Sequence, residues 1–89
     1  MDVSYDPAKN EANVRKHGVS FEQVRAFDFH TALIDLDDRY DYGEDRMIAL
    51  GFIGEGLYVL VFVETATGIR VISLRPATPR EGVRYAEAP

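Results

Sequence analysis

The most restrictive feature of this chain is an uninterrupted apolar run, LYVLVFV, from Leu57 to Val63. Successive side chains of a β-strand point to opposite faces of the sheet, so a strand that is apolar at every position needs cover on both faces. The run is shorter than the ~18 apolar residues that a membrane-spanning helix requires. It therefore predicts a central strand over Leu57–Thr65, with other elements packed on each face of the sheet.

The segments on either side of this run have the pattern of further strands. Each is short, rich in branched or aromatic residues, and separated from the next by a turn that contains glycine. Short turns connect antiparallel neighbours, so these segments predict an antiparallel meander. The predicted strands are 31–37, 46–53, 57–65 and 69–75, and the turns lie around Gly43, at 54–56 and at 66–68.

A helix is predicted near the N-terminus, well before the first of these strands. Asp6 followed by Pro7 is typical of an N-cap and a first helical residue, because the carboxylate accepts free amide hydrogens and proline lacks one. Gly18 is typical of the left-handed residue that follows a helix, which places the helix end at His17. The preceding segment Val3–Tyr5 has the composition of a short edge strand.

A second helix is predicted directly after Gly18. Ser20 and Gln23 match the S-x-x-Q capping box, and Phe21, Val24 and Phe27 would form the apolar face of a helix that ends near His30.

A third helix is predicted near the C-terminus, with Thr78 as N-cap, Pro79 as first residue and Glu81 completing another capping box. The expected fold is α+β: two N-terminal helices, a four-stranded antiparallel sheet and a C-terminal helix. With 89 residues and no internal repeat or linker, residues 1–89 are expected to form a single domain.

The charge of the chain is acidic and unevenly distributed. The formal net charge is −5, and the segment Thr31–Asp45 alone has six acidic residues and one basic residue. Such a run could bind a divalent cation through its oxygen atoms, but its spacing matches no known metal loop, and a solvated hairpin is the simpler interpretation. The absence of cysteine excludes disulfides, thiol nucleophiles and zinc–thiolate sites. Without an N-terminal signal sequence, a cytoplasmic location is expected.

His17 and Lys16 lie at the expected end of the first helix, where two interpretations are open. A cation there interacts favourably with the helix dipole, which is a purely structural role. An imidazolium stabilised in this way is also suited to general acid catalysis or to phosphate binding. The other histidine, His30, has no basic neighbour and is interpreted as structural.

Arg75 and Arg80 are the second candidate cluster. A cation in the first turn of a helix is electrostatically unfavourable, so stability does not explain Arg80. Two guanidinium groups beside a helix N-terminus can bind phosphate, because their paired N–H donors match phosphate oxygens. The alternative is that both arginines form ion pairs with Glu81 or with the acidic hairpin.

Three stretches of the chain, YDPAKNEANVRKHGVSFEQV, GEDRMIALG and RVISLRPATPREGVRY, together resemble the BrnT family of type II toxins. The resemblance extends from Tyr5 to Tyr85 in the family's order. It implies a RelE-like ribonuclease fold and an endoribonuclease toxin that cleaves RNA to inhibit translation and is neutralised by a cognate antitoxin. The implied antitoxin is ribbon-helix-helix-like (BrnA-type), and the toxin would reach operator DNA only through it.

The same resemblance assigns functional positions and partners. Catalytic roles are implied for His17, Arg75 and Arg80, and RNA binding for Lys16, Arg46 and Tyr85. RNA is the expected substrate, bound either free or on the ribosome, and neither a metal, a cofactor nor a membrane is expected to take part. The chemistry would be metal-independent: arginine neutralises the phosphorane and His17 transfers protons.

An alternative function from another class is a toxin-like interaction module. It would bind an antitoxin and modulate repression of the operon without cleaving RNA. The acidic hairpin favours this alternative in part, because a basic antitoxin segment could bind there or along an exposed sheet edge.

Overall fold

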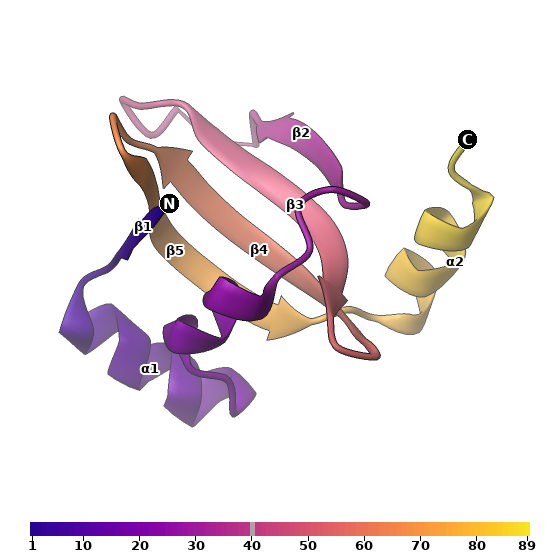
Figure 1. Ribbon diagram of the computed structural model, residues 1–89, viewed down its shortest axis with the longest axis horizontal. Helices are drawn as coiled ribbons and strands as arrows, with labels where there is room; N and C mark the ends of the chain where they lie inside the picture. The colour runs from indigo at the N-terminus through magenta and orange to yellow at the C-terminus, as the bar shows by residue number, and fades with distance from the viewer. Residues whose placement is uncertain (40) are drawn as a thin grey trace.

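The apolar run lies in the middle of the sheet. In the computed structural model, which describes residues 1–39 and 41–89, β4 (Gly56–Glu64) is the central strand of five (Figure 1). It pairs antiparallel with β3 (Arg46–Ile53) and with β5 (Gly68–Pro76), and β2 (Leu33–Asp37) pairs antiparallel with β3. These four strands form the expected meander, with one irregularity between β4 and β5 at Val61/Phe62.

The prediction of a purely antiparallel, four-stranded sheet is wrong. A fifth strand, β1 (Asp2–Ser4), pairs in parallel with the start of β5, so the sheet is mixed and its order is β1-β5-β4-β3-β2. Gly68 permits this pairing, because a Cβ atom at that position would collide with the backbone of Asp2. A strand of three residues has too little alternation to predict from sequence which partner it pairs with or in which direction.

The prediction of two N-terminal α-helices is also wrong. The first, α1 (Pro7–His17), begins and ends as expected, with Asp6 as N-cap and Gly18 in the left-handed conformation at φ 72°. The second is a 3-10 helix, η1 (Phe21–Ala26), and Phe27 then pairs with Ile53 in an isolated bridge.

The apolar spacing explains why η1 is a 3-10 helix. Phe21, Val24 and Phe27 are separated by three residues each, which matches the three residues per turn of a 3-10 helix and brings all three onto one line. All three are buried, and the amide of Gln23 donates to the carbonyl of Ser20, three residues earlier, at 3.1 Å. If an α-helix continued to His30, Phe27 could not form its bridge with Ile53 of β3.

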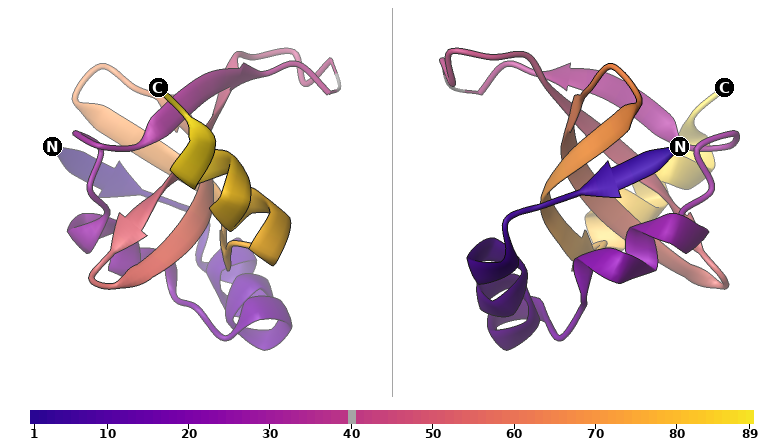
Figure 2. Two further views of the ribbon diagram at one scale, coloured as in Figure 1. Left: turned by 90° about the vertical axis from the view of Figure 1, so that its right-hand side faces the viewer. Right: turned by 60° about the vertical axis from the view of Figure 1, so that its left-hand side comes forward.

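The two faces of the sheet have different cover (Figures 1 and 2). On one face, residues from η1 and its flanks pack against the sheet and form the hydrophobic core. That core consists of Val19, Phe21, Val24, Phe27, Ala49, Leu60, Phe62, Ile69, Val71 and Leu74. Among the described residues, no helix is both long enough and apolar enough to cross a membrane.

The opposite face is covered in part by α2 (Pro79–Glu87), which lies across it in the left view of Figure 2. Thr78 and Glu81 form the expected capping box, with each side chain bonded to the other's backbone amide. The ring of Tyr85 contacts Phe52 edge-on at 5.2 Å between centroids, and its hydroxyl donates to the carbonyl of Thr31 at 2.8 Å. No residue of α2 is buried, so a few side-chain contacts hold this helix on the sheet.

Candidate active site

The candidate site lies at the end of β5, and Asn13 of α1 helps to form it. Beyond Ser4, β1 no longer covers the outer edge of β5, and the side chain of Asn13 binds that edge instead. Its Nδ2 donates to the carbonyls of Leu74 (2.8 Å) and Val19 (2.9 Å), and its Oδ1 accepts from the amide of Leu74 at 3.3 Å. Asn13 is 7% exposed. This clamp holds the last turn of α1, with His17, beside Arg75.

His17 is partly buried, and its pKa is lowered from 6.5. Burial is the main cause, followed by the positive charges of Lys16 and Arg75. These effects outweigh the expected stabilisation of an imidazolium by the helix dipole. His17 is therefore mainly neutral at neutral pH, which suits a general base. The influence of Arg75 also shows that the two side chains lie within electrostatic reach of each other.

Arg75 forms a two-pronged ion pair with Glu81. Its Nη1 and Nη2 donate to the two carboxylate oxygens at 2.7 and 2.9 Å, and Nη1 also donates to the carbonyl of Pro76 at 3.3 Å. The pair raises the pKa of Arg75 and lowers the pKa of Glu81 to about 2. Glu81 therefore stays ionised. The alternative weighed from sequence, that Arg75 pairs with Glu81, is what the structure shows.

This pairing leaves one edge of the Arg75 guanidinium free. A guanidinium has five N–H donors, and the Glu81 and Pro76 contacts use three of them. The part of the chain that the structure describes offers no acceptor to the edge formed by Nε and Nη2. The Arg75 side chain is 33% exposed, so this second edge can accept an anion while Glu81 stays in place.

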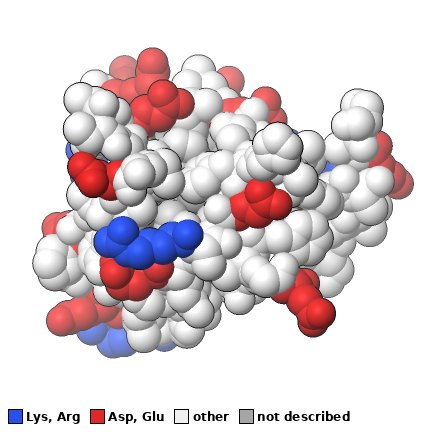
Figure 3. Space-filling view, in the orientation of Figure 1, with Lys and Arg blue, Asp and Glu red and all other residues white. Residues whose placement is uncertain are grey.

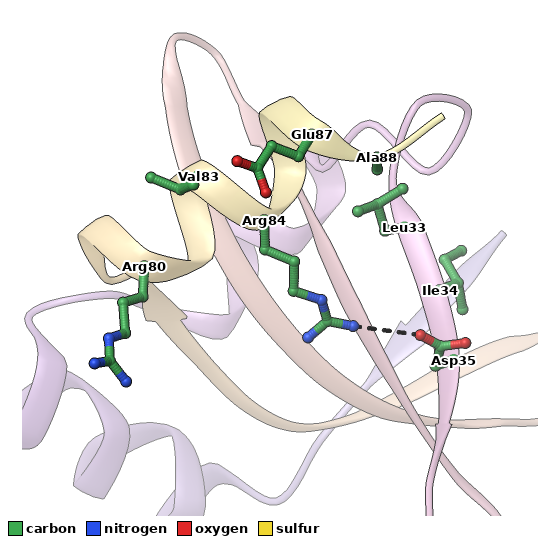
Figure 4. Close-up of a pocket in the computed structure, with 8 residues that line it drawn as sticks. All are labelled: Leu33, Ile34, Asp35, Arg80, Val83, Arg84, Glu87 and Ala88. Atoms are coloured by element: carbon green, nitrogen blue, oxygen red, sulfur yellow. Dashed lines mark ion pairs between the residues drawn. The ribbon is translucent and has the colours of Figure 1, made fainter.

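Arg80 differs from Arg75 in having no ion pair or hydrogen bond within residues 1–39 and 41–89. It is exposed in the first turn of α2, and Figure 4 shows its guanidinium pointing away from Asp35 and Arg84. The structure records no interaction between Arg80 and His17 in the described residues. Of the predicted catalytic residues, His17 and Arg75 thus lie within electrostatic reach of each other, and Arg80 lies in the first turn of α2.

The residues predicted to bind RNA are spread more widely. Lys16 is exposed beside His17. Tyr85 uses its hydroxyl and ring to hold α2, as described above. Arg46 is the first residue of β3. Leu50 of β3 pairs with Val59 of β4, which pairs in turn with Arg75 of β5, and Arg46 is four residues before Leu50. At ~3.3 Å per residue, Arg46 is ~13 Å farther along the sheet. Its guanidinium lies over the ring of Tyr42 at 3.9 Å and near Glu44 at 3.7 Å.

Arg39 is a charged residue of this face that the sequence interpretation missed. It donates through Nε (2.7 Å) and Nη2 (2.9 Å) to the carboxylate of Asp37, whose side chain is 1% exposed. The pair raises the pKa of Arg39 and lowers that of Asp37, and the charge of Arg39 reaches Arg75. The sequence favoured a solvated hairpin. Local sequence does not distinguish one buried carboxylate in an acidic run from its exposed neighbours.

Acidic and basic side chains both lie on the face of the molecule that Figure 3 shows. In Figure 3 acidic side chains are spread over the face in view, and the basic areas lie towards the lower left, where Figure 1 shows η1 and α1. No group of three or more His, Asp or Glu side chains suited to a metal ion is found among the described residues.

Comparison with known proteins supplies the family. The model of the family described as "Ribonuclease toxin, BrnT, of type II toxin-antitoxin system" matches residues 5–81. The crystal structure of the Brucella abortus ribonuclease toxin BrnT superposes with a TM-score of 0.71 and 26% sequence identity, covering 88% of this chain and 97% of that one. A search of curated proteins gave no match. Since the family model covers most of the chain, the protein belongs to the BrnT family of ribonuclease toxins of type II toxin–antitoxin systems.

Proposed function

We propose that this toxin cleaves RNA without a metal ion at the end of β5, with His17 as the proton acceptor and Arg75 and Arg80 as phosphate ligands. The observation that carries the proposal is the position of the partly buried His17 at the end of α1, which Asn13 attaches to β5 at Leu74, the residue before Arg75. General base catalysis and charge neutralisation at phosphorus are the two functions that such cleavage needs most.

In the proposed reaction the 2′-oxygen of a ribose attacks the adjacent phosphorus. Neutral His17 accepts the 2′-hydroxyl proton as the bond from O2′ to phosphorus forms. The bond from phosphorus to O5′ breaks, and the leaving oxygen takes a proton from water at this accessible site. The products are a 2′,3′-cyclic phosphate and a 5′-hydroxyl, and the hydroxide left by the water neutralises the imidazolium.

The free edge of Arg75 supports its role in this reaction. The Nε and Nη2 donors match two phosphate oxygens, and the Glu81 pair fixes the guanidinium before substrate arrives. Loss of one such preorganised donor typically lowers kcat about 10²- to 10³-fold. Arg80 has no competing partner in the described chain, so its guanidinium is available to the same or the adjacent phosphate.

RNA binding in this proposal involves Lys16 beside His17, Arg46 farther along the sheet and Tyr85 on α2. Affinity for RNA depends strongly on phosphate contacts and is sensitive to salt. A net charge of −5 disfavours tight binding of free RNA, so we infer that cleavage is most efficient on RNA presented by the ribosome.

An antitoxin is a partner of this chain, because the family acts in type II toxin–antitoxin systems. We infer that this antitoxin is of the ribbon-helix-helix-like BrnA type and that it carries the contact with operator DNA. The resemblance of the sequence to the family supports this inference.

Cleavage of an end-labelled RNA by the purified chain, in buffer containing EDTA, tests the proposal. We expect products that end in a 2′,3′-cyclic phosphate, and a loss of about 10²-fold or more in the His17→Ala and Arg75→Ala variants. His30→Ala and Arg25→Ala are matched controls, because both side chains are exposed and outside the site, and they should cleave normally. Circular dichroism checks that each variant folds.

Two results would contradict the proposal. Undiminished cleavage by a folded His17→Ala variant would exclude His17 as the base. Absence of cleavage by the wild type on free RNA and on ribosomes, with normal growth after induction without antitoxin, would favour the interaction module instead.

A further inference from the structure

The edge of the sheet formed by β2 is open. β2 is the last strand in the sheet order, so alternate backbone N–H and C=O groups point outward from it without a neighbouring strand. Proteins usually protect such edges with proline, charged side chains, an inward-pointing charge or a bulge. The sequence of β2, LIDLD, contains no proline or lysine, and its pairing with β3 has no register shift, so its protection is limited to the exposed Asp35 and the buried Asp37.

A groove of about 680 Å³ runs beside this edge, between β2 and α2. Figure 4 shows its two sides: Leu33, Ile34 and Asp35 on the strand, and a longer set of residues on the helix. Two of the lining side chains are large, apolar and exposed, namely Ile34 at 41% and Val83 at 57%. Leu36, the next outward residue along β2, is 53% exposed.

The charge around this edge is negative. The negative charge lies in the hairpin that continues β2 and contains Asp38, Asp41, Glu44 and Asp45. The lining of the groove itself is balanced, with Asp35 and Glu87 alongside Arg80 and Arg84. Arg84 reaches Asp35 at 3.5 Å, but both side chains are more than 65% exposed, so this pair is weak and easily exchanged. A partner that combines positive charge with apolar side chains would complement this surface.

We propose that the groove between β2 and α2 binds an extended, basic segment of the antitoxin as a sixth strand of the sheet. Alternation along such a strand would place apolar side chains beside Ile34 and Leu36, and basic side chains beside Asp35 on the other face. The proposal depends on the antitoxin partner that family membership implies, but not on the catalytic roles of His17 or Arg75.

The occupied groove would also act on the candidate active site. The helix that forms one wall of the groove carries Arg80 and Glu81, and Glu81 holds Arg75. A strand packed against Val83 would therefore fix the position of α2 relative to β5 without covering His17.

Affinity measurements with the cognate antitoxin test this assignment. The variants are Val83→Lys, which puts a positive charge on the apolar wall, and Asp35→Lys, which reverses the charge of the edge. Glu11→Lys is the matched control, because it makes the same charge change on an exposed position of α1. We expect the two groove variants to bind at least tenfold more weakly and Glu11→Lys to bind as the wild type does. Wild-type affinity in both groove variants would overturn the proposal.

Two further measurements separate this proposal from its alternatives. Amide hydrogen exchange should slow over residues 33–37 when antitoxin binds, and protection confined to another segment would contradict strand addition. Sedimentation of the toxin alone tests self-association: a dimer abolished by Val83→Lys, with antitoxin affinity unchanged, would assign the groove to a second copy. RNA cleavage by the free groove variants is expected at the wild-type rate, so failure of the catalytic proposal is recognised separately.

Discussion

Arg75 and Glu81 meet through two parallel hydrogen bonds of 2.7 and 2.9 Å, and this pair joins β5 to the first turn of α2. Because Glu81 also accepts from the amide of Thr78 at 2.8 Å, one carboxylate both begins a helix and orients a candidate phosphate ligand. Stability and function are therefore coupled at this residue.

The Glu81→Gln variant is expected to lose about 1–2 kcal/mol of unfolding free energy at pH 7, because the amide cannot form the ion pair with Arg75. The pKa of Glu81 in the folded chain is about 2, below its ordinary 4.5. Its contribution is thus complete above pH 4.5 and is lost as the pH falls towards 2. Urea unfolding at pH 7 and at pH 3 checks this. The difference from wild type should shrink at pH 3, whereas exposed Glu11→Gln should show no difference.

The pH dependence of cleavage should follow the ionisation of His17. Its pKa is lowered from 6.5, so the neutral base is present above pH 6.5 and is lost on acidification below it. The same sign applies to stability: the neutral imidazole is favoured in the folded chain, so stability falls as the pH drops below 6.5. Lys16→Gln removes one cation and should raise the pKa of His17. NMR titration of the imidazole and the acid limb of kcat/KM should shift together; an unchanged acid limb would exclude His17 as the base.

Asn13→Ala is expected to destabilise the fold by about 2–3 kcal/mol, because it leaves the buried amide and carbonyl of Leu74 and the carbonyl of Val19 without this partner. Cleavage should fall as well, since the variant loosens the turn that positions His17. Glu11→Ala, on the exposed side of the same helix, should change stability by less than about 0.5 kcal/mol. Chemical denaturation measures both variants, and equal stability of the two would contradict the clamp.

Two glycines should respond to alanine with opposite signs. Gly68→Ala places a Cβ against the backbone of Asp2 and should displace β1 from β5, whereas Gly82 has open space around its Cβ position in α2. Gly82→Ala should stabilise the chain by about 0.5–1 kcal/mol through helix propensity. Thermal unfolding measures both effects: the Tm should fall for Gly68→Ala and rise for Gly82→Ala. A stable Gly68→Ala variant with slow amide exchange in β1 would show that the close approach is not required.

Sequence was sufficient where an element carries its own boundary signals. The caps at Asp6, Gly18 and Thr78 predicted both ends of α1 and the start of α2, and the apolar run predicted the central strand of the meander, because caps and hydrophobic patterns are local properties. The short edge strand expected at Val3–Tyr5 is present as β1, but sequence was insufficient for its partner and direction and for the 3-10 form of η1. The three residues of β1 are strand only because Gly68 lets them approach β5. The three-residue spacing of Phe21, Val24 and Phe27 suits a 3-10 helix but is also found in α-helices. The pairing of Phe27 with Ile53, which follows η1, is a contact that local sequence does not encode.

The candidate site shows the same division. Pattern and family resemblance identified His17, Arg75 and Arg80 as residues to examine. The direction of the pKa shift of His17 was not predicted, because burial and the approach of Arg75 are tertiary effects that exceed the local helix dipole. The contacts of Asn13 were not predicted either. A helical asparagine that binds a buried strand edge cannot be distinguished by local sequence from one that faces solvent.

The clamp between Asn13 and Leu74 joins residues separated by 61 positions, and β1 joins Asp2 to Gly68. Contacts between such distant segments form late in folding, because the intervening chain must first be ordered. During synthesis, α1 has no edge to bind until β5 has left the ribosome. A chain that ends before Leu74 lacks the carbonyl and the amide that Asn13 binds. The candidate site therefore forms only when α1 and β5, which lie near opposite ends of the chain, have folded together.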